Sequence, residues 1–147
     1  MPTRILTACA LAVCLTARAA EPVDDKAAIQ GTWELTGRGK PAEPDVVCEK
    51  VVFKGDTLTF HYLFDGKRFT TECVFKLDAA TDPKQIDFTR TEDGKKGKPY
   101  LGIYELKDGK LRLNYRGPES TRPKDFKDEL AGTNVTQRME FELERKK

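Results

Sequence analysis

The sequence is poor in the side chains from which most active sites are built. Of its 147 residues, one is a histidine, His61, and one is a tryptophan, Trp33. A single histidine excludes a metal site made of several histidines, and strand alternation places His61 on an outer face, away from any pocket. The acids Asp78, Asp82 and Asp87 lack the alternating spacing and the glycine of a calcium loop. We therefore expect no catalytic residue, no metal, no cofactor and no enzyme activity.

Apolar runs long enough to cross a membrane are also lacking. The stretch from Ile5 to Ala17 is uncharged, but it is shorter than the roughly 20 residues that a membrane helix needs. It follows Arg4 and ends at Ala17-Arg18-Ala19, which has the small-x-small pattern of a cleavage site. This order predicts a signal peptide over residues 1–19 and an exported protein, periplasmic or secreted. A buried N-terminal helix is the alternative.

Lipid anchoring is a second alternative for the N-terminus. Leu6-Thr7-Ala8-Cys9 resembles a lipoprotein processing box, which would attach a lipid to Cys9. Only two apolar residues, Ile5 and the first residue of the box, Leu6, follow Arg4 before Thr7, whereas a signal peptide normally has an apolar core of about 7–15 residues. A cleaved, unanchored signal peptide is therefore the preferred interpretation.

A surplus of basic residues is missing once the predicted signal peptide is set aside. Arg4 and Arg18 lie within it and no acid does, so the remainder carries 24 basic and 24 acidic residues. Nucleic-acid binding depends on an excess of Lys and Arg that displaces counterions from phosphates. We therefore expect no nucleic-acid partner.

Helical periodicity is absent after residue 30, and short runs of alternating apolar and polar residues take its place. Residues 20–30 form a lead-in segment, and residues 31–147 form one domain. The runs predict strands at about 31–37, 46–54, 57–64, 67–77, 85–91, 99–107, 110–116 and 137–146.

Three two-residue turns set the pairing of these strands. Gly55-Asp56, Asp65-Gly66 and Asp108-Gly109 have the residues that tight hairpin loops require. Each turn pairs its flanking residues, so Lys54 faces Thr57, and the pairing continues outward in steps of one residue.

Period-two alternation along these ladders then gives one apolar face. The predicted inward residues are Val51, Phe53, Leu58, Phe60, Tyr62, Phe64, Phe69, Cys73, Phe75, Leu77, Ile86, Phe88, Tyr104, Leu106, Leu111, Leu113, Tyr115, Met139, Phe141 and Leu143. The opposite face includes Lys50, His61, Glu72, Arg112 and Asn114. We expect an all-β fold, an up-and-down antiparallel barrel of about eight strands; a sandwich is the alternative.

The same register bears on the two remaining cysteines. It places Cys48 on the outer face, opposite Leu63, and Cys73 on the inner face, opposite Leu58. The two Cα atoms are then about 19 Å apart, at 3.3 Å per residue and 4.8 Å per strand. A disulfide requires less than about 7 Å, so both thiols are predicted to be unpaired unless a bulge at Glu49-Lys50 shifts the register.

Gly31-Thr32-Trp33 resembles the G-x-W that opens lipocalin barrels. More widely, residues 29–147 are similar to an uncharacterised family of small exported lipocalin-like domains, expanded in planctomycetes. The segments that carry this resemblance are Gln30-Gly31-Thr32-Trp33, Phe53-Lys54-Gly55-Asp56, Phe75-Lys76-Leu77-Asp78, Pro83-Lys84-Gln85-Ile86-Asp87, Lys96-Gly97-Lys98, Leu101-Gly102-Ile103-Tyr104-Glu105-Leu106 and Arg122-Pro123-Lys124-Asp125-Phe126. The resemblance implies a barrel and brings no catalytic residues. Cys48 and Cys73 depart from the pattern, and the T-D-Y motif of true lipocalins is absent.

In lipocalin-like barrels the tryptophan of the first strand closes one end, and an arginine of the last strand lies over it. Arg145 has the inward parity for this role, so it is the candidate structural cap of Trp33; a frayed terminus is the alternative. Such a cation–π contact contributes about 0.5–2 kcal/mol.

Two functions remain open. The first is binding of a small apolar ligand in the barrel, with candidate lining residues Trp33, Phe60, Tyr62, Phe69, Tyr104 and Tyr115. The second is a structural or protein-interaction domain with a filled core, which would bind an exported protein through exposed residues such as Leu63, Leu101 and Ile103. The long connection from Gly117 to Gln137 is interpreted as a lid or as a plug over the barrel mouth.

Overall fold

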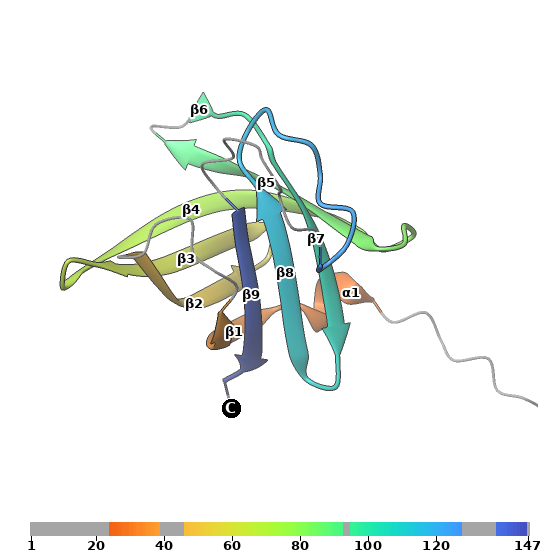
Figure 1. The fold of residues 1–147 in the computed structure, drawn as a ribbon, viewed down its shortest axis with the longest axis horizontal. Helices are drawn as coiled ribbons and strands as arrows, with labels where there is room; N and C mark the ends of the chain where they lie inside the picture. Colours follow the sequence, from red (N-terminus) through yellow and green to blue (C-terminus); the bar gives the residue numbers. More distant parts are fainter. Residues whose placement is uncertain (1–23, 39–45, 93–94, 128–137, 147) are drawn as a thin grey trace, which may run out of the picture.

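The alternating runs form a β-barrel in the computed structural model, which describes residues 24–38, 46–92, 95–127 and 138–146. Within these residues the chain forms a short helix, α1, and nine strands (Figure 1). Their bounds are α1 Asp25–Ala28, β1 Gly31–Arg38, β2 Val46–Lys54, β3 Thr57–Phe64, β4 Lys67–Asp78, β5 Lys84–Glu92, β6 Lys95–Lys96, β7 Tyr100–Lys107, β8 Lys110–Arg116 and β9 Arg138–Arg145. The predicted signal peptide and the start of the lead-in segment lie outside the described residues.

Eight of these strands close into a ring. Each pairs antiparallel with its neighbour in the order β1, β2, β3, β4, β5, β7, β8 and β9, and β9 returns to β1. The two-residue strand β6 is added to the end of β5. The predicted up-and-down barrel of eight strands is therefore confirmed, and the sandwich is not formed.

The three turns set the register as predicted. Lys54 pairs with Thr57, Phe64 with Lys67, and Lys107 with Lys110. Gly55, Gly66 and Gly109, together with Asp65 and Asp108, have positive φ angles, which tight hairpin loops require. The predicted register therefore holds along the whole β3–β4 and β7–β8 ladders.

The apolar face makes one continuous core. Its buried members are Ile29, Trp33, Cys48, Val51, Phe53, Leu58, Phe60, Tyr62, Cys73, Phe75, Ile86, Phe88, Tyr100, Tyr104, Leu111, Leu113, Tyr115 and Leu143. Leu77 and Leu106 are partly buried against it. Two predicted core residues are wrong, because Phe64 and Phe69 are 46% and 42% exposed. The side chains of Met139 and Phe141 lie outside the described set.

A β-bulge corrects the placement of Cys48. The pairing of β2 with β3 shifts between Cys48 and Lys50, so Cys48 faces Tyr62 instead of Leu63. The extra residue, Glu49, turns Cys48 to the inner face, where it is buried. Both thiols are nevertheless free, as predicted.

The outer face of β7 and β8 is covered where the sequence predicted an exposed surface. Ile103 and Asn114 are buried. The segment from residue 117 to residue 127 folds back alongside β7 (Figure 1). Asn114 Nδ2 donates to the Asp125 carbonyl at 3.1 Å, and the Arg122 guanidinium donates to the Gly102 carbonyl at 2.7 Å. The described part of this connection therefore lies on the barrel wall, neither a lid nor a plug over the mouth. Residues 128–137 lie outside the described set.

Candidate binding surface at the projecting hairpin

The six candidate lining residues lie at three levels along the barrel, so they do not surround a single cavity. Trp33 and Tyr104 are at the end that α1 covers. Phe60 and Tyr115 are in the middle. The Tyr62 ring stacks on Phe60 and on Phe69, which lies at the opposite rim.

At the α1 end, a buried carboxylate holds the helix against the barrel. Asp25 is 4% exposed, and its Oδ2 accepts hydrogen bonds from the Tyr104 hydroxyl at 2.6 Å and from Lys84 Nζ at 2.7 Å. Burial raises the pKa of Asp25, but the hydrogen bonds from Lys84 and Tyr104 and the charge of Lys84 outweigh burial and lower that pKa below its usual value. The sequence analysis missed this role, because it placed Asp25 only within the lead-in segment of residues 20–30.

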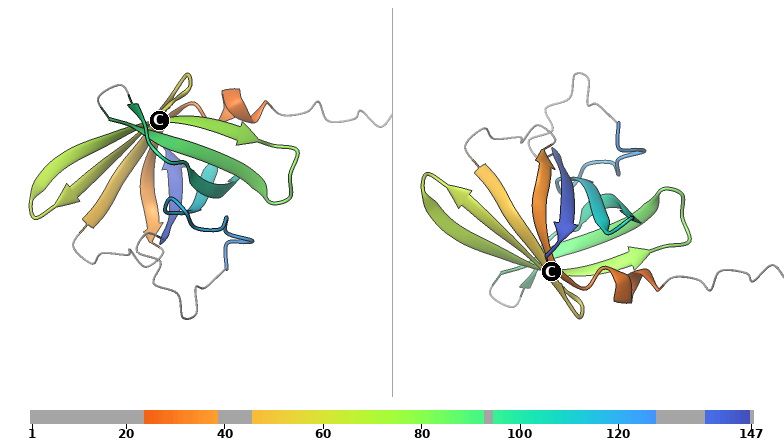
Figure 2. Two further views of the ribbon diagram at one scale, coloured as in Figure 1. Left: turned by 90° about the horizontal axis from the view of Figure 1, so that it is seen from above. Right: turned by 90° about the horizontal axis from the view of Figure 1, so that it is seen from below.

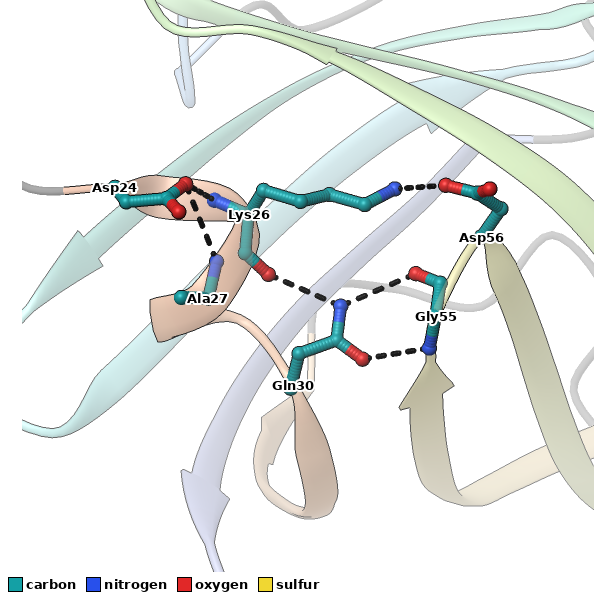
Figure 3. Close-up of polar contacts among 6 residues, drawn as sticks. All are labelled: Asp24, Lys26, Ala27, Gln30, Gly55 and Asp56. Carbon is teal, nitrogen blue, oxygen red and sulfur yellow. Dashed lines mark hydrogen bonds and ion pairs between the residues drawn. The ribbon is translucent and has the colours of Figure 1, made fainter.

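Further contacts join α1 and Gln30 to the β2–β3 turn (Figure 3). Gln30 and Gly55 exchange two hydrogen bonds, and Lys26 Nζ lies 2.6 Å from Asp56 Oδ1. Asp24 caps the helix by accepting from the backbone N–H groups of Lys26 and Ala27.

Trp33 fills this end of the barrel. It is 1% exposed, and its indole Nε1–H donates to the Ile29 carbonyl at 2.8 Å. Arg145 pairs with Trp33 in the β1–β9 ladder, and its guanidinium carbon lies 4.9 Å from the ring centroid. The predicted contact is therefore present, and its contribution to stability stays a prediction. The Trp33 and Tyr104 side chains thus seal this end.

In the middle of the barrel, aromatic rings from opposite walls meet. Strands β3 and β8 are four places apart in the ring of eight, yet the Phe60 and Tyr115 rings lie 5.8 Å apart, centroid to centroid. Phe88 lies between them, 5.4 Å from Phe60 and 4.8 Å from Tyr115. At this level, side chains fill the distance between the walls.

The opposite rim carries a projecting hairpin. β4 runs from Lys67 to Asp78, but β5 pairs with it only from Cys73 onward. The tip of the β3–β4 hairpin therefore extends past the barrel, as the two views of Figure 2 show. Phe64 and Phe69 stand on this extension. They have inward parity, but no strand of the described part of the chain faces them, which explains their exposure. Phe69 stacks on Tyr62 with centroids 5.2 Å apart.

A cation faces inward beside this hairpin. Arg90 pairs with Cys73, so it shares the inward parity of Phe88, and its guanidinium carbon lies 5.2 Å above the Tyr100 ring. Within the described residues no carboxylate lies at ion-pair distance from it. Exposed rings, a free strand edge and this cation together make the rim the best candidate binding surface.

The thiols and the histidine do not form a catalytic pair. Burial raises the pKa of Cys48 to about 12 and that of Cys73 to about 11, so both stay protonated and unreactive at neutral pH. The Cys48 thiol contacts the Lys50 carbonyl at 3.7 Å. Burial and the charge of Lys50 lower the pKa of His61, which favours its neutral form. Within the described set, no three His, Cys, Asp or Glu side chains gather closely enough to hold a metal ion.

A hollow lies on the outer wall near the β7–β8 turn. It has a volume of about 320 Å³ and is lined by charged residues, Glu105, Lys107, Asp108, Lys110, Arg112 and Glu142. Glu105 and Arg112 form a cross-strand ion pair there at 3.5 Å. These side chains neutralise one another, so the hollow offers no net charge to a ligand.

Comparison of the chain with protein-family models, with curated proteins and with solved structures found no match. The part of the chain that the structure describes contains no helix with the length and hydropathy of a transmembrane segment.

Proposed function

We propose that this protein is an exported, non-enzymatic protein-interaction domain that binds its partner through the tip of the β3–β4 hairpin. The observation that carries the proposal is the exposure of Phe64 and Phe69 on an extension that no second wall covers. Exposed aromatic residues that gather at one place are typical of interaction sites. Export rests on the signal-peptide pattern of residues 1–19. The family relationship rests on the sequence resemblance alone.

The ring contacts across the barrel favour this function over ligand carriage. A small apolar ligand needs a cavity of about 300–1,000 Å³, most of it enclosed. Between Phe60, Phe88 and Tyr115 the walls are already bridged by side chains in van der Waals contact. At this level of the barrel, a ligand could enter only by displacing these rings.

The expected contribution of the two phenylalanines is modest. Fully burying such a side chain contributes about 1.5–3 kcal/mol, and each ring is a little under half exposed, so each adds about 1 kcal/mol on binding. Together they contribute about 2 kcal/mol, roughly a thirtyfold change in Kd.

The test compares proteins that co-purify with the chain from its own host after cross-linking. One variant is Phe64→Ser/Phe69→Ser. The control is Lys76→Ser, near the end of β4 that is distant from the hairpin tip. The proposal expects a protein partner with the wild type and the control, and its loss with the double variant. An unchanged set of partners, or a small molecule in place of a protein in native mass spectrometry, would contradict it.

A further inference from the structure

Within the described residues, no strand pairs with the outer edge of β4 at the projecting hairpin, so we call this edge free. Residues 67–72 pair with β3 on one side, and the last pair with β5 is Cys73–Arg90. Figure 1 shows the end of β5 diverging from β4. Unpaired backbone groups along a strand edge are a template for another strand.

The orientation of the backbone groups on this edge follows from the turn. Residues that flank a two-residue loop form a hydrogen-bonded pair, so Phe64 and Lys67 bond to each other. Odd-numbered residues of β4 then direct their N–H and C=O groups at β3. Phe75 confirms this parity, because its N–H donates across to the Asp56 carbonyl at 2.9 Å. Arg68, Thr70 and Glu72 therefore direct their N–H and C=O groups to the free edge.

We propose that a second copy of this chain docks on this edge, so that two β4 strands pair antiparallel about a two-fold axis at Phe69. This inference rests on the proposed function and names the partner. In this register Arg68 of one chain exchanges backbone hydrogen bonds with the partner's Thr70, and Thr70 does so with the partner's Arg68. Phe69 stands opposite the partner's Phe69, which covers the exposed rings of both chains.

The space on the edge selects this register. An axis at Thr70 would place the partner's Lys67 opposite Cys73, where β5 already lies. An axis at Phe69 places the partner's Gly66 opposite Glu72, so the added strand ends where β5 begins. An axis between the two residues would pair edge-facing groups with groups that point at β3.

Charges on the outer side of the edge are complementary in this register. Glu72 is diagonal to the partner's Arg68, a separation that long side chains span. Within the described residues Glu72 has no ion-pair partner of its own. Arg68 is 75% exposed, and its Nε and Nη2 donate to Glu49, which leaves Nη1 to meet a second carboxylate. The two-fold axis forms both Glu72–Arg68 pairs at once. Because each chain uses the same edge, the assembly stops at a dimer and does not grow into a fibre.

The first test compares two substitutions at Thr70 by sedimentation velocity from about 1 µM to about 1 mM protein. Thr70→Pro removes an N–H that faces solvent in the single chain, a position where an edge strand tolerates proline. Thr70→Ala keeps that N–H and is the matched control. We expect the wild type and Thr70→Ala to dimerise equally, and Thr70→Pro to dimerise at least tenfold more weakly. A wild type that stays monomeric, or equal dimerisation of both variants, would overturn the inference.

A second test does not depend on how the proline variant folds. The two-fold axis brings residue 69 of both chains to a non-hydrogen-bonded pair with Cα atoms about 4.5 Å apart, within disulfide range. Phe69→Cys is expected to form a covalent dimer under mild oxidation, and Thr71→Cys, which does not face itself, is not. Equal cross-linking of both variants, or none with Phe69→Cys, contradicts the register.

Failure of this inference is distinguishable from failure of the proposed function. If the chain is monomeric but Phe64→Ser/Phe69→Ser still abolishes the capture of a different protein, the hairpin is a binding surface and the partner is not a second copy. If the double variant changes neither self-association nor capture, both proposals fail.

Discussion

Replacing Asp25 with asparagine tests whether its charge, and not only its shape, holds α1 on the barrel. Asparagine keeps an oxygen that can accept from the Tyr104 hydroxyl, but it removes the carboxylate charge, so the Tyr104 bond becomes neutral and Lys84 loses its ion pair. A hydrogen bond to a charged group contributes about 1.5–3 kcal/mol and a neutral one about 0.5–1.5 kcal/mol. Two such bonds give a loss of about 2 kcal/mol in the free energy of unfolding.

Solvent reduces this figure. The Lys84 side chain is 39% exposed, so water partly compensates its ammonium group when the carboxylate is removed. A loss of about 1–2 kcal/mol remains, which lowers Tm by roughly 4–8 °C in a domain of this size. Thermal unfolding followed by circular dichroism measures this change. Asp24→Asn is the control, since asparagine caps a helix as well as aspartate and Tm should not change.

The pH dependence separates a charge effect from a packing effect. The pKa of Asp25 is lower in the folded chain than its ordinary value of 3.8, so the carboxylate stabilises the fold above that value and stops doing so as the pH falls through the folded pKa. The gap between the wild type and Asp25→Asn should be full at neutral pH and should close in acid. An equal gap at both pH values, or a Tm within about 1 °C of the wild type, would refute the reasoning.

Two further predictions concern the contact of Arg145 with Trp33 and the two buried cysteines. Arg145→Ala should lower Tm by a few degrees and shift Trp33 fluorescence to longer wavelength, because about 0.5–1 kcal/mol of cation–π contact is lost and water reaches the ring. Lys146→Ala is the control. If neither Tm nor the fluorescence changes in Arg145→Ala, Arg145 does not cap Trp33. Cys48 and Cys73 should resist alkylation in the native protein, since they are buried, and both should react in denaturant without reductant, since they are unpaired. Intact mass measures the labelling. A denatured chain that stays unlabelled and is two daltons lighter than the reduced chain would reveal a disulfide.

Local sequence predicted most of the strand pairing. The turns at Gly55-Asp56, Asp65-Gly66 and Asp108-Gly109 predicted the observed pairing because a two-residue loop leaves its flanking residues a single partner. The bulge at Glu49 entered the sequence analysis only as a possible exception at Glu49-Lys50, because no residue type there requires a bulge; the pairing of β2 with β3 decides it.

The candidate binding surface was less accessible to such reasoning. Alternation gave Phe64 and Phe69 the correct face, but their exposure depends on β5 leaving β4 at Arg90. The role of Asp25 depends on Lys84 and Tyr104, which are 59 and 79 residues away along the chain.

The sequence by itself determined which residues form strands, how hairpin neighbours pair and which face is apolar. These properties follow from side-chain alternation and turn chemistry, which act over a few residues. The tertiary structure decided which parts of that apolar face meet an opposite wall, where a strand edge stays free, and which carboxylate is buried. Those outcomes arise when strands distant in sequence meet, because only then does one element's surface exclude water from another.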